Sequence, residues 1–191
     1  LTEATTTRDG GQGQTVQIPR GEFDVATPFN IPNRAALVGV NKRGSRIKAA
    51  SGFVGSYMVT VDNGTSSMFD NRLAHLTLDC NNVASLGGID SQAWQEGGGL
   101  EHVLVQNFRT YGLRMREMEG GAALCNISDT EIFGSTSGCT AGILLDDPSL
   151  SGAFQLNIRN TTIAGGDMPA SMPRGIDVQG GSMFVTACHV E

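Results

Sequence analysis

Short stretches in which apolar and polar residues alternate recur along the chain. They read HLTLDC, HVLVQN, ALCNISD, FQLNIRN and MFVTA and begin at His75, His102, Ala123, Phe154 and Met183. Alternation with a period of two is typical of β-strands that bury one face. The sequence therefore predicts a series of short, half-buried strands.

A second kind of stretch falls between these and begins with glycine. It occurs as GID, GLRM, GILL and GIDV, at Gly88, Gly112, Gly142 and Gly175, so the glycines are 24, 30 and 33 residues apart. The last apolar residues of the first kind recur at intervals of 27, 22, 31 and 27 residues; they are Leu78, Val105, Ile127, Ile158 and Val185. Two interleaved patterns with one variable period indicate a repeat.

A repeat of short strands with glycine-marked corners is typical of a coil in which each turn lies parallel to the next. Hairpins are disfavoured, because the Asn-Gly turns that close them are missing between these stretches. A polar column supports the coil. Asn107, Asp129 and Asn160, with Cys80 and Ala187 at the ends, each follow an apolar pair. Asn and Asp tolerate left-handed backbone, so we expect these residues to stack at one corner.

The N-terminal third adds a family resemblance. TVQIPRGEFDVATPFNIPNRAALVGVNKRGSRIKAA resembles the first turns of the pectate-lyase-like right-handed parallel β-helix superfamily, and the resemblance extends from Gln14 to Glu191. The style of the turns is most like that of bacteriophage tailspike and virion appendage proteins. The resemblance implies an all-β, right-handed, single-stranded parallel β-helix, a fold shared by lyases, hydrolases, epimerases and viral spikes.

We expect one β-helix domain over residues 1–191, with residues 1–13 as part of an N-terminal cap. The G-D-x-x-x-D-D-T-type loop that usually precedes the cap helix in this superfamily is absent, and Cys188–Glu191 falls within a strand pattern. An open end of a parallel coil exposes unpaired backbone groups. The chain is therefore interpreted as part of a longer protein.

Composition narrows the classes of partner. The net charge of −6 and the pI near 5.0 disfavour a nucleic-acid binder. No apolar run is long enough to span a bilayer, so membrane insertion is not expected. The four cysteines lack a C-x-x-C pair, which disfavours zinc, and Cys125 and Cys188 are interpreted as small buried hydrophobic residues.

Candidate binding residues follow from the glycine-led strands, whose outward positions should form a strip. These positions carry Asp90, Gln92, Arg114, Arg116, Leu144, Asp146, Asp177 and Gln179. Planar acid, guanidinium and amide groups suit saccharide hydroxyls, so Asp90, Arg114, Arg116 and Gln179 are candidate substrate-binding residues. Trp94, in the loop SQAWQEGGG, is a further candidate for stacking on a sugar. The alternative is a solvated face, or a face buried against another subunit.

Catalytic chemistry would need two carboxylates at a defined separation, and Asp146 and Asp177 on neighbouring turns are the candidate pair. By resemblance, a lyase would use aspartates on calcium and an arginine base, with Arg114 or Arg116 the nearest match. No cofactor is expected, and calcium, which would need several oxygen ligands together, is the alternative. His75 and His102 share a column, but no third metal ligand recurs there, and a corner role is expected instead.

The resemblance favours a virion spike or appendage that binds a host surface polysaccharide. It implies a homotrimer that contacts other virion proteins and is located in the virion. One alternative is a polysaccharide depolymerase, a lyase or glycoside hydrolase, secreted or carried by a virion. Another is a purely structural virion or decoration protein.

Overall fold

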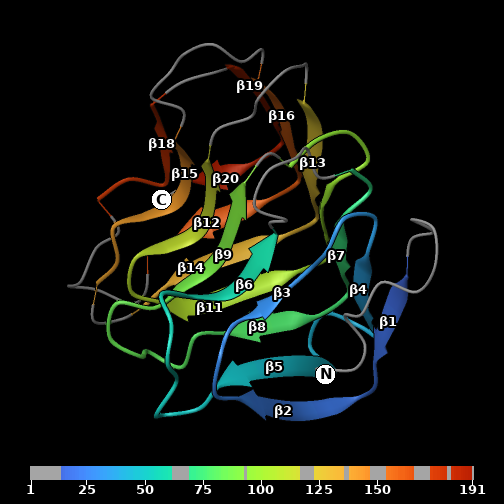
Figure 1. Ribbon diagram of the computed structural model, residues 1–191. Coiled ribbons are helices and arrows are strands. Elements are labelled where there is room, and N and C mark those ends of the chain that lie inside the picture. The colour runs from blue at the N-terminus through green and yellow to red at the C-terminus, as the bar shows by residue number, and fades with distance from the viewer. Residues whose placement is uncertain are drawn as a thin grey trace.

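The computed structural model describes residues 14–61, 69–92, 94–116, 123–135, 138–146, 154–165, 173–179 and 182–190. These residues form twenty strands and no helix. The strands belong to three parallel sheets, which we name A, B and C. The chain visits the three sheets in turn, and Figure 1 shows the coil rising from the blue N-terminal rungs to the red C-terminal rungs. The predicted parallel β-helix is confirmed, with the right-handed connections that parallel strands adopt.

Each sheet is built from every third strand. Sheet A contains β1 (Thr15–Ile18), β4 (Ala36–Gly39), β7 (Arg72–Ala74), β10 (Gly99–Glu101), β13 (Ala123–Ser128), β16 (Phe154–Arg159) and β19 (Ser182–Thr186). Sheet B contains β2 (Gly21–Val25), β5 (Ser45–Ala49), β8 (Thr77–Asp79), β11 (Leu104–Phe108), β14 (Glu131–Gly134), β17 (Thr162–Ala164) and β20 (His189–Val190). Sheet C contains β3 (Phe29–Asn30), β6 (Tyr57–Val61), β9 (Gly87–Gln92), β12 (Tyr111–Arg116), β15 (Ala141–Asp146) and β18 (Ile176–Val178).

The core is the inside of the coil, where apolar side chains stack from rung to rung. The central rungs exclude solvent from these columns, which include Leu73, Leu100, Ile127 and Ile158 in sheet A, Leu78, Val105, Ile132 and Ile163 in sheet B, and Ile89, Leu113 and Ile143 in sheet C. No rung can bury such a row alone. Stacking is what makes the core continuous.

The register corrects the repeat that the sequence suggested. Val105 lies in sheet B and pairs with Ile132, whereas Ile127 lies in sheet A and pairs with Leu100. Val105 and Ile127, which are 22 residues apart, were wrongly taken as equivalent positions of the repeat, because they lie in different sheets. The alternation in two neighbouring strands of one rung is the same, so the pattern alone does not show which sheet a strand joins.

The corner between sheets A and B has left-handed backbone on successive rungs. His75, His102, Asp129, Asn160 and Ala187 have φ values of 56°, 52°, 52°, 48° and 51°. Their side chains stack where they are long enough: the two histidine rings lie 5.2 Å apart, and the amide of Asn160 donates to the Asp129 carboxylate. The expected corner stack therefore exists, with the two histidines in it.

Asn107 was assigned to this stack wrongly. Asn107 follows the sheet B residue Gln106 and lies at the next corner, with a φ of 60°. Cys80 lies at the same corner, and its backbone amide donates to the Gln106 carbonyl at 2.9 Å. The amide of Asn107 donates instead to Asp79 Oδ1 at 2.9 Å. The error has the same origin as the wrong interval, because the sequence does not distinguish two corners of one rung.

Asp79 is a fully buried carboxylate that links three rungs of sheet B. It accepts hydrogen bonds from Arg46, from Gln106 at 2.7 Å and from the backbone amide of Asn81 at 2.7 Å, in addition to that of Asn107. Burial by itself would raise the pKa of Asp79. The hydrogen bonds outweigh it and hold the pKa below its usual value.

The cysteines agree in part with the prediction. All four are free, and Cys125 is fully buried in sheet A, where burial raises the pKa of its thiol to about 12. Such a thiol stays protonated and packs as a small hydrophobic side chain. Cys188 packs against the core but is only half-buried.

Candidate functional site

The outer face of sheet C carries the strip predicted from the glycine-led strands. The register places Asp90, Arg114, Leu144 and Asp177 in one column, and Gln92, Arg116 and Asp146 in the next. Adjacent rungs lie one strand spacing apart, about 4.8 Å. Side chains on neighbouring rungs are therefore close enough to pair directly. We call Tyr57, Asp90, Arg114, Arg116 and Asp146 the C strip.

Both arginines of β12 pair diagonally with an acid on a neighbouring rung. Arg116 makes a two-pronged contact with Asp90 on β9, with Nε 3.0 Å from Oδ1 and Nη2 2.8 Å from Oδ2. Arg114 reaches the other way, to β15, where Nε lies 2.9 Å from Asp146 Oδ2 and Nη2 contacts the same oxygen. The pairs are partly shielded, since the side chains of Asp90 and Asp146 are 9% and 20% exposed.

Tyr57 is a member of the C strip that the sequence reasoning missed. It lies opposite Gly87, whose missing side chain leaves room for the tyrosine ring. Burial raises the pKa of Tyr57, and the negative charge of Asp90 raises it further, while a hydrogen bond with Arg114 opposes them. The outward positions were taken from glycine-led strands only. Alternation would not have found Tyr57, because it places this residue on the same side as the buried Val59 and Val61.

Asp146 and Asp177 lie on neighbouring rungs but not at equivalent positions. Asp177 is opposite Leu144, two residues before Asp146. Each acid also has its own basic partner, because Asp146 is paired with Arg114 and Asp177 with Arg174. The candidate pair therefore lies on neighbouring rungs, as expected, but one column apart. A catalytic role for the two acids stays a prediction.

Gln179 lies beside Asp177 at the C-terminal end of the same face. Its amide nitrogen is 3.4 Å from Asp177 Oδ2, and its backbone amide donates to the Leu145 carbonyl at 2.9 Å. Gln179 therefore continues the column of Asp146 on the next rung. The predicted binding residues Asp90, Arg114, Arg116 and Gln179 share one face. Their role in binding stays a prediction.

Among the described residues, the acids are not grouped as a calcium site requires. Within the part of the chain that the structure describes, no group of three or more His, Cys, Asp or Glu side chains could hold a metal ion. Calcium requires six to eight oxygen ligands, and here the acids are separated by arginines.

The described residues contain no helix of the length and apolarity needed to cross a membrane.

Trp94 does not present its ring to a ligand. Its side chain is fully buried, and the indole nitrogen donates to the Asn71 carbonyl at 3.0 Å. The expected stacking on a sugar is therefore wrong for this structure. SQAWQEGGG reads as a polar loop, but the tryptophan turns inward and packs in the core beneath Gly98.

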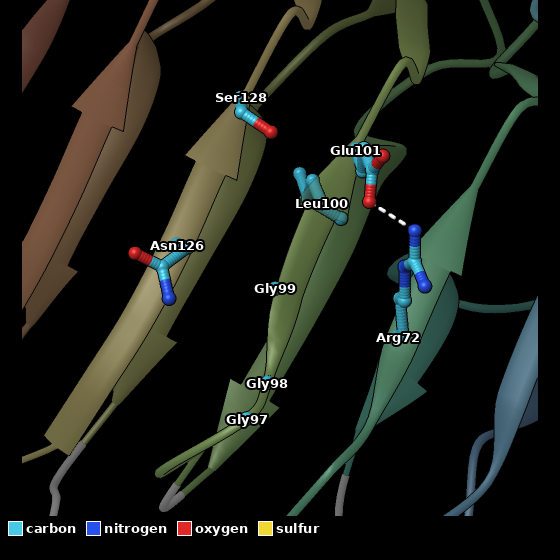
Figure 2. Close-up of a pocket in the computed structure, with 8 residues that line it drawn as sticks. All are labelled: Arg72, Gly97, Gly98, Gly99, Leu100, Glu101, Asn126 and Ser128. Carbon is cyan, nitrogen blue, oxygen red and sulfur yellow. Dashed lines mark hydrogen bonds and ion pairs between the residues drawn. The ribbon is translucent and has the colours of Figure 1, made fainter.

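A hollow of about 240 Å3 lies on the outer face of sheet A, which the sequence did not indicate. We call it the A hollow. Its lining consists of Arg72, Gly97, Gly98, Gly99, Leu100, Glu101, Asn126 and Ser128. Figure 2 shows the Arg72–Glu101 ion pair on one side, Asn126 and Ser128 on the other, and the bare glycine backbone between them.

The A hollow exists because Gly99 occupies an outward position without a side chain. It lies between Arg72 and Asn126 in its column. Its φ of 153° disfavours other residues, and a Cβ there would come within 1.9 Å of the Asn126 carbonyl oxygen. The close approach of two strands thus removes one side chain from an outward column. The glycine run Gly97–Gly99 is the signal that could have pointed to it.

Comparison with protein families identifies the class. The model of the family described as rhamnogalacturonase A/epimerase, pectate lyase-like, matches residues 3–190. The chain belongs to this family, as the resemblance in the sequence implied. Curated protein sequences yield no match.

Solved structures give more distant similarities. ORF18 of Geobacillus virus E2 superposes with a TM-score of 0.55 at 14% identity, over 97% of this chain and 42% of that one. The premature gene product 12 of bacteriophage phi29 has a TM-score of 0.44 at 17% identity, over 88% of this chain and 29% of that one. The A-module of the mannuronan C-5 epimerase AlgE6 from Azotobacter vinelandii has a TM-score of 0.37 at 11% identity, over 92% and 90%. The chain spans less than half the length of the Geobacillus virus protein.

Proposed function

We propose that this chain is the β-helical part of a virion appendage of a bacterial virus, and that it binds a polysaccharide on the host surface. The similarity in fold to ORF18 of Geobacillus virus E2 supports the viral setting. The C strip carries the proposal for the ligand, because it places two ordered guanidinium–carboxylate pairs side by side on one outer face.

The chemistry of the C strip suits hydroxyl groups. A guanidinium that is already paired keeps its remaining N–H groups in a fixed plane, and a paired carboxylate keeps its remaining acceptor sites fixed. Binding a sugar then costs little ordering of the side chains. Because each charge has a partner, the strip offers directional donors and acceptors without a large net charge.

Arg114→Ala combined with Arg116→Ala tests the proposal. Full-length protein is applied to an array of bacterial capsular polysaccharides and lipopolysaccharide O-chains, and bound protein is quantified. We expect at least one glycan to retain the parent protein and to lose the double variant by tenfold or more, because two pairs of donors are removed.

Arg43→Ala is the control, in the turn between β4 and β5. Arg43 pairs with Glu131, its side chain is 72% exposed, and Lys42 also pairs with Glu131. The control removes one cation from another face and should bind as the parent does. No retention on any glycan, or equal loss in Arg43→Ala, would contradict the proposal.

Membership of the family favours a second candidate function, a polysaccharide depolymerase. Asp146→Asn and Asp177→Asn keep the shape of each side chain and remove its charge. If the protein is a lyase or hydrolase, reducing ends or unsaturated sugars appear with the parent and disappear with one of these variants. Glycan binding without any such product favours the appendage.

The proposal includes a homotrimer within a virion, attached to other virion proteins. Sedimentation of the intact protein should give the mass of three chains. A monodisperse monomer at micromolar concentration would contradict the trimer and leave glycan binding to be judged separately. A purely structural virion protein would instead form the trimer and bind no glycan.

A further inference from the structure

The A hollow is separated from the C strip, since the two lie on outer faces of different sheets. Its walls carry both donors and acceptors. Arg72 and Glu101 form a closed ion pair on one side. On the other side, no described residue hydrogen-bonds the amide nitrogen of Asn126 or the hydroxyl of Ser128. These groups are therefore available to a ligand.

The Asn126 column continues from the hollow along the face of sheet A. The column contains Gly99, Asn126, Asn157 and Phe184 on four successive rungs. The Asn157 amide donates to Asn126 Oδ1 at 3.3 Å, which orients the Asn126 amide nitrogen. Phe184 stands at the far end, three strand spacings or about 14 Å from Gly99.

Phe184 is an aromatic side chain that is 60% exposed on an outward position. Contact of an exposed aromatic ring with water is unfavourable, and the ring contributes nothing to the core. A ring beside amide groups is suited to stacking on the apolar face of a sugar. Arg159, exposed opposite Ser128, adds one cation to the same face.

The size of the hollow limits what it can hold. Its volume of about 240 Å3 is below the 300–1,000 Å3 typical of pockets that enclose a whole small-molecule ligand, so it suits a single ring. A longer ligand would continue over the open face toward Phe184. The length of that path matches a short chain of linked sugars.

We infer that the outer face of sheet A is a second saccharide-binding surface, in which one sugar ring enters the A hollow and a later ring stacks on Phe184. The inference rests on the ligand class of the proposed function, but not on the C strip. An acidic oligosaccharide is expected to bind at least as well as a neutral one, because Arg159 has no acidic partner among the described residues.

Trp94 provides a reporter for this surface. It is the only tryptophan of the chain, and its indole lies against the inner side of Gly98, whose outer side lines the hollow. Occupation of the hollow should therefore shift the indole N–H resonance and the fluorescence of Trp94. The C strip is on another sheet and has no such reporter.

The experiment titrates full-length protein with maltotriose, chitotriose and trigalacturonate. These probes carry hydroxyls alone, N-acetyl groups and carboxylates, respectively. We expect at least one to shift the Trp94 signal to saturation. Phe184→Ala should weaken that binding about threefold to tenfold, the range of one lost aromatic contact. The double variant Asn126→Ala, Ser128→Ala should weaken it by at least as much.

All these substitutions are at outward positions, and thermal unfolding confirms that each variant is folded. Arg43→Ala, in the turn between β4 and β5, is the control and should leave the Trp94 titration unchanged. A silent Trp94 signal with all three probes overturns the inference. A saturating signal that neither Phe184→Ala nor the double variant weakens also overturns it.

The outcomes separate this inference from the proposed function. If Trp94 stays silent while glycan retention depends on Arg114 and Arg116, the second surface is wrong and the C strip stands. If retention instead depends on Phe184 and Asn126, the second surface stands and the C strip is not the binding site.

Discussion

The C strip and the outer face of sheet A carry similar side chains, but side chains fill the first face and leave the A hollow on the second. Each presents outward columns that cross several rungs, and each contains an arginine paired with an acid. In the C strip the arginines of β12 reach acids on both neighbouring rungs, and their side chains are only 31% and 32% exposed. On sheet A the Arg72–Glu101 pair is 46% and 39% exposed, and the glycines beside it leave the A hollow.

The difference originates in the backbone. Every outward position of the C strip from Asp90 to Asp146 carries a side chain, so charges meet across rungs and fill the face. On sheet A, Gly99 approaches the backbone of Asn126 too closely for any side chain. A filled face therefore depends on which side chains are present, whereas the hollow depends on how closely two strands approach.

The largest expected effect comes from Gly99→Ala. The added Cβ would lie 1.9 Å from the Asn126 carbonyl oxygen at a φ of 153°, so β10 and β13 must separate. We expect a loss of about 3 kcal/mol or more in the free energy of unfolding, from backbone strain and broken ladder contacts. Urea denaturation of the two proteins measures it.

Gly52→Ala is the matched control for that change. A Cβ at Gly52 would meet no atom within 4 Å, and Gly52 is not among the residues with positive φ. Its effect should be within about 0.5 kcal/mol. If both variants were equally stable, the hollow would not be imposed by the backbone, and its glycines would need another explanation.

Arg116→Ala and Arg72→Ala compare the two ion pairs directly. Arg116→Ala leaves Asp90, 9% exposed, without its two-pronged partner, so we expect a loss of about 2 kcal/mol. Arg72→Ala removes an exposed pair and should cost at most about 0.5 kcal/mol. Thermal unfolding at low and high salt measures both losses.

The salt dependence of the two losses in stability is a second test of this comparison. Added salt should reduce the small effect of Arg72→Ala and change that of Arg116→Ala much less, because screening acts mainly on exposed charges. Equal losses in the two variants would show that the C strip is no better shielded than sheet A.

The fold was largely predictable from the sequence because inward positions repeat. The apolar residues that alternate with the predicted outward positions, among them Leu113, Met115, Ile143 and Leu145, are fully buried. The register was not predictable to the same degree. Two strands of one rung alternate identically, so Val105 was aligned with Ile127 although its partner is Ile132. Pairing depends on the length of each corner, which alternation does not contain.

The candidate site was predictable where it depends on outward side chains in strands. Asp90, Arg114, Arg116 and Asp146 share one face as expected. Trp94 and the A hollow were not predictable, because they depend on a loop that turns its aromatic side chain inward and on the close approach of two strands at Gly99. Composition made that loop look polar and exposed. Its three glycines are instead explained by close contacts.

A smaller effect than that of Arg116→Ala is expected at Tyr57, which distinguishes the faces by pH. Burial and the charge of Asp90 raise the pKa of Tyr57, so the folded protein favours the protonated phenol. Its contribution to stability is complete below the unfolded pKa of about 10 and is lost as the pH rises through the higher folded pKa. Tyr57→Phe should therefore flatten the alkaline part of the stability curve, and should cost only about 0.5–1 kcal/mol at neutral pH.

Tyrosinate absorbance as a function of pH tests this directly, because the chain has only two tyrosines, Tyr57 and Tyr111. The parent should show a delayed component at high pH that is absent from Tyr57→Phe, and Phe184→Ala on sheet A should retain it. A delayed component that persists in Tyr57→Phe would place the shielded phenol at Tyr111 instead. In that case the ionisation of Tyr57 would no longer distinguish the C strip from sheet A.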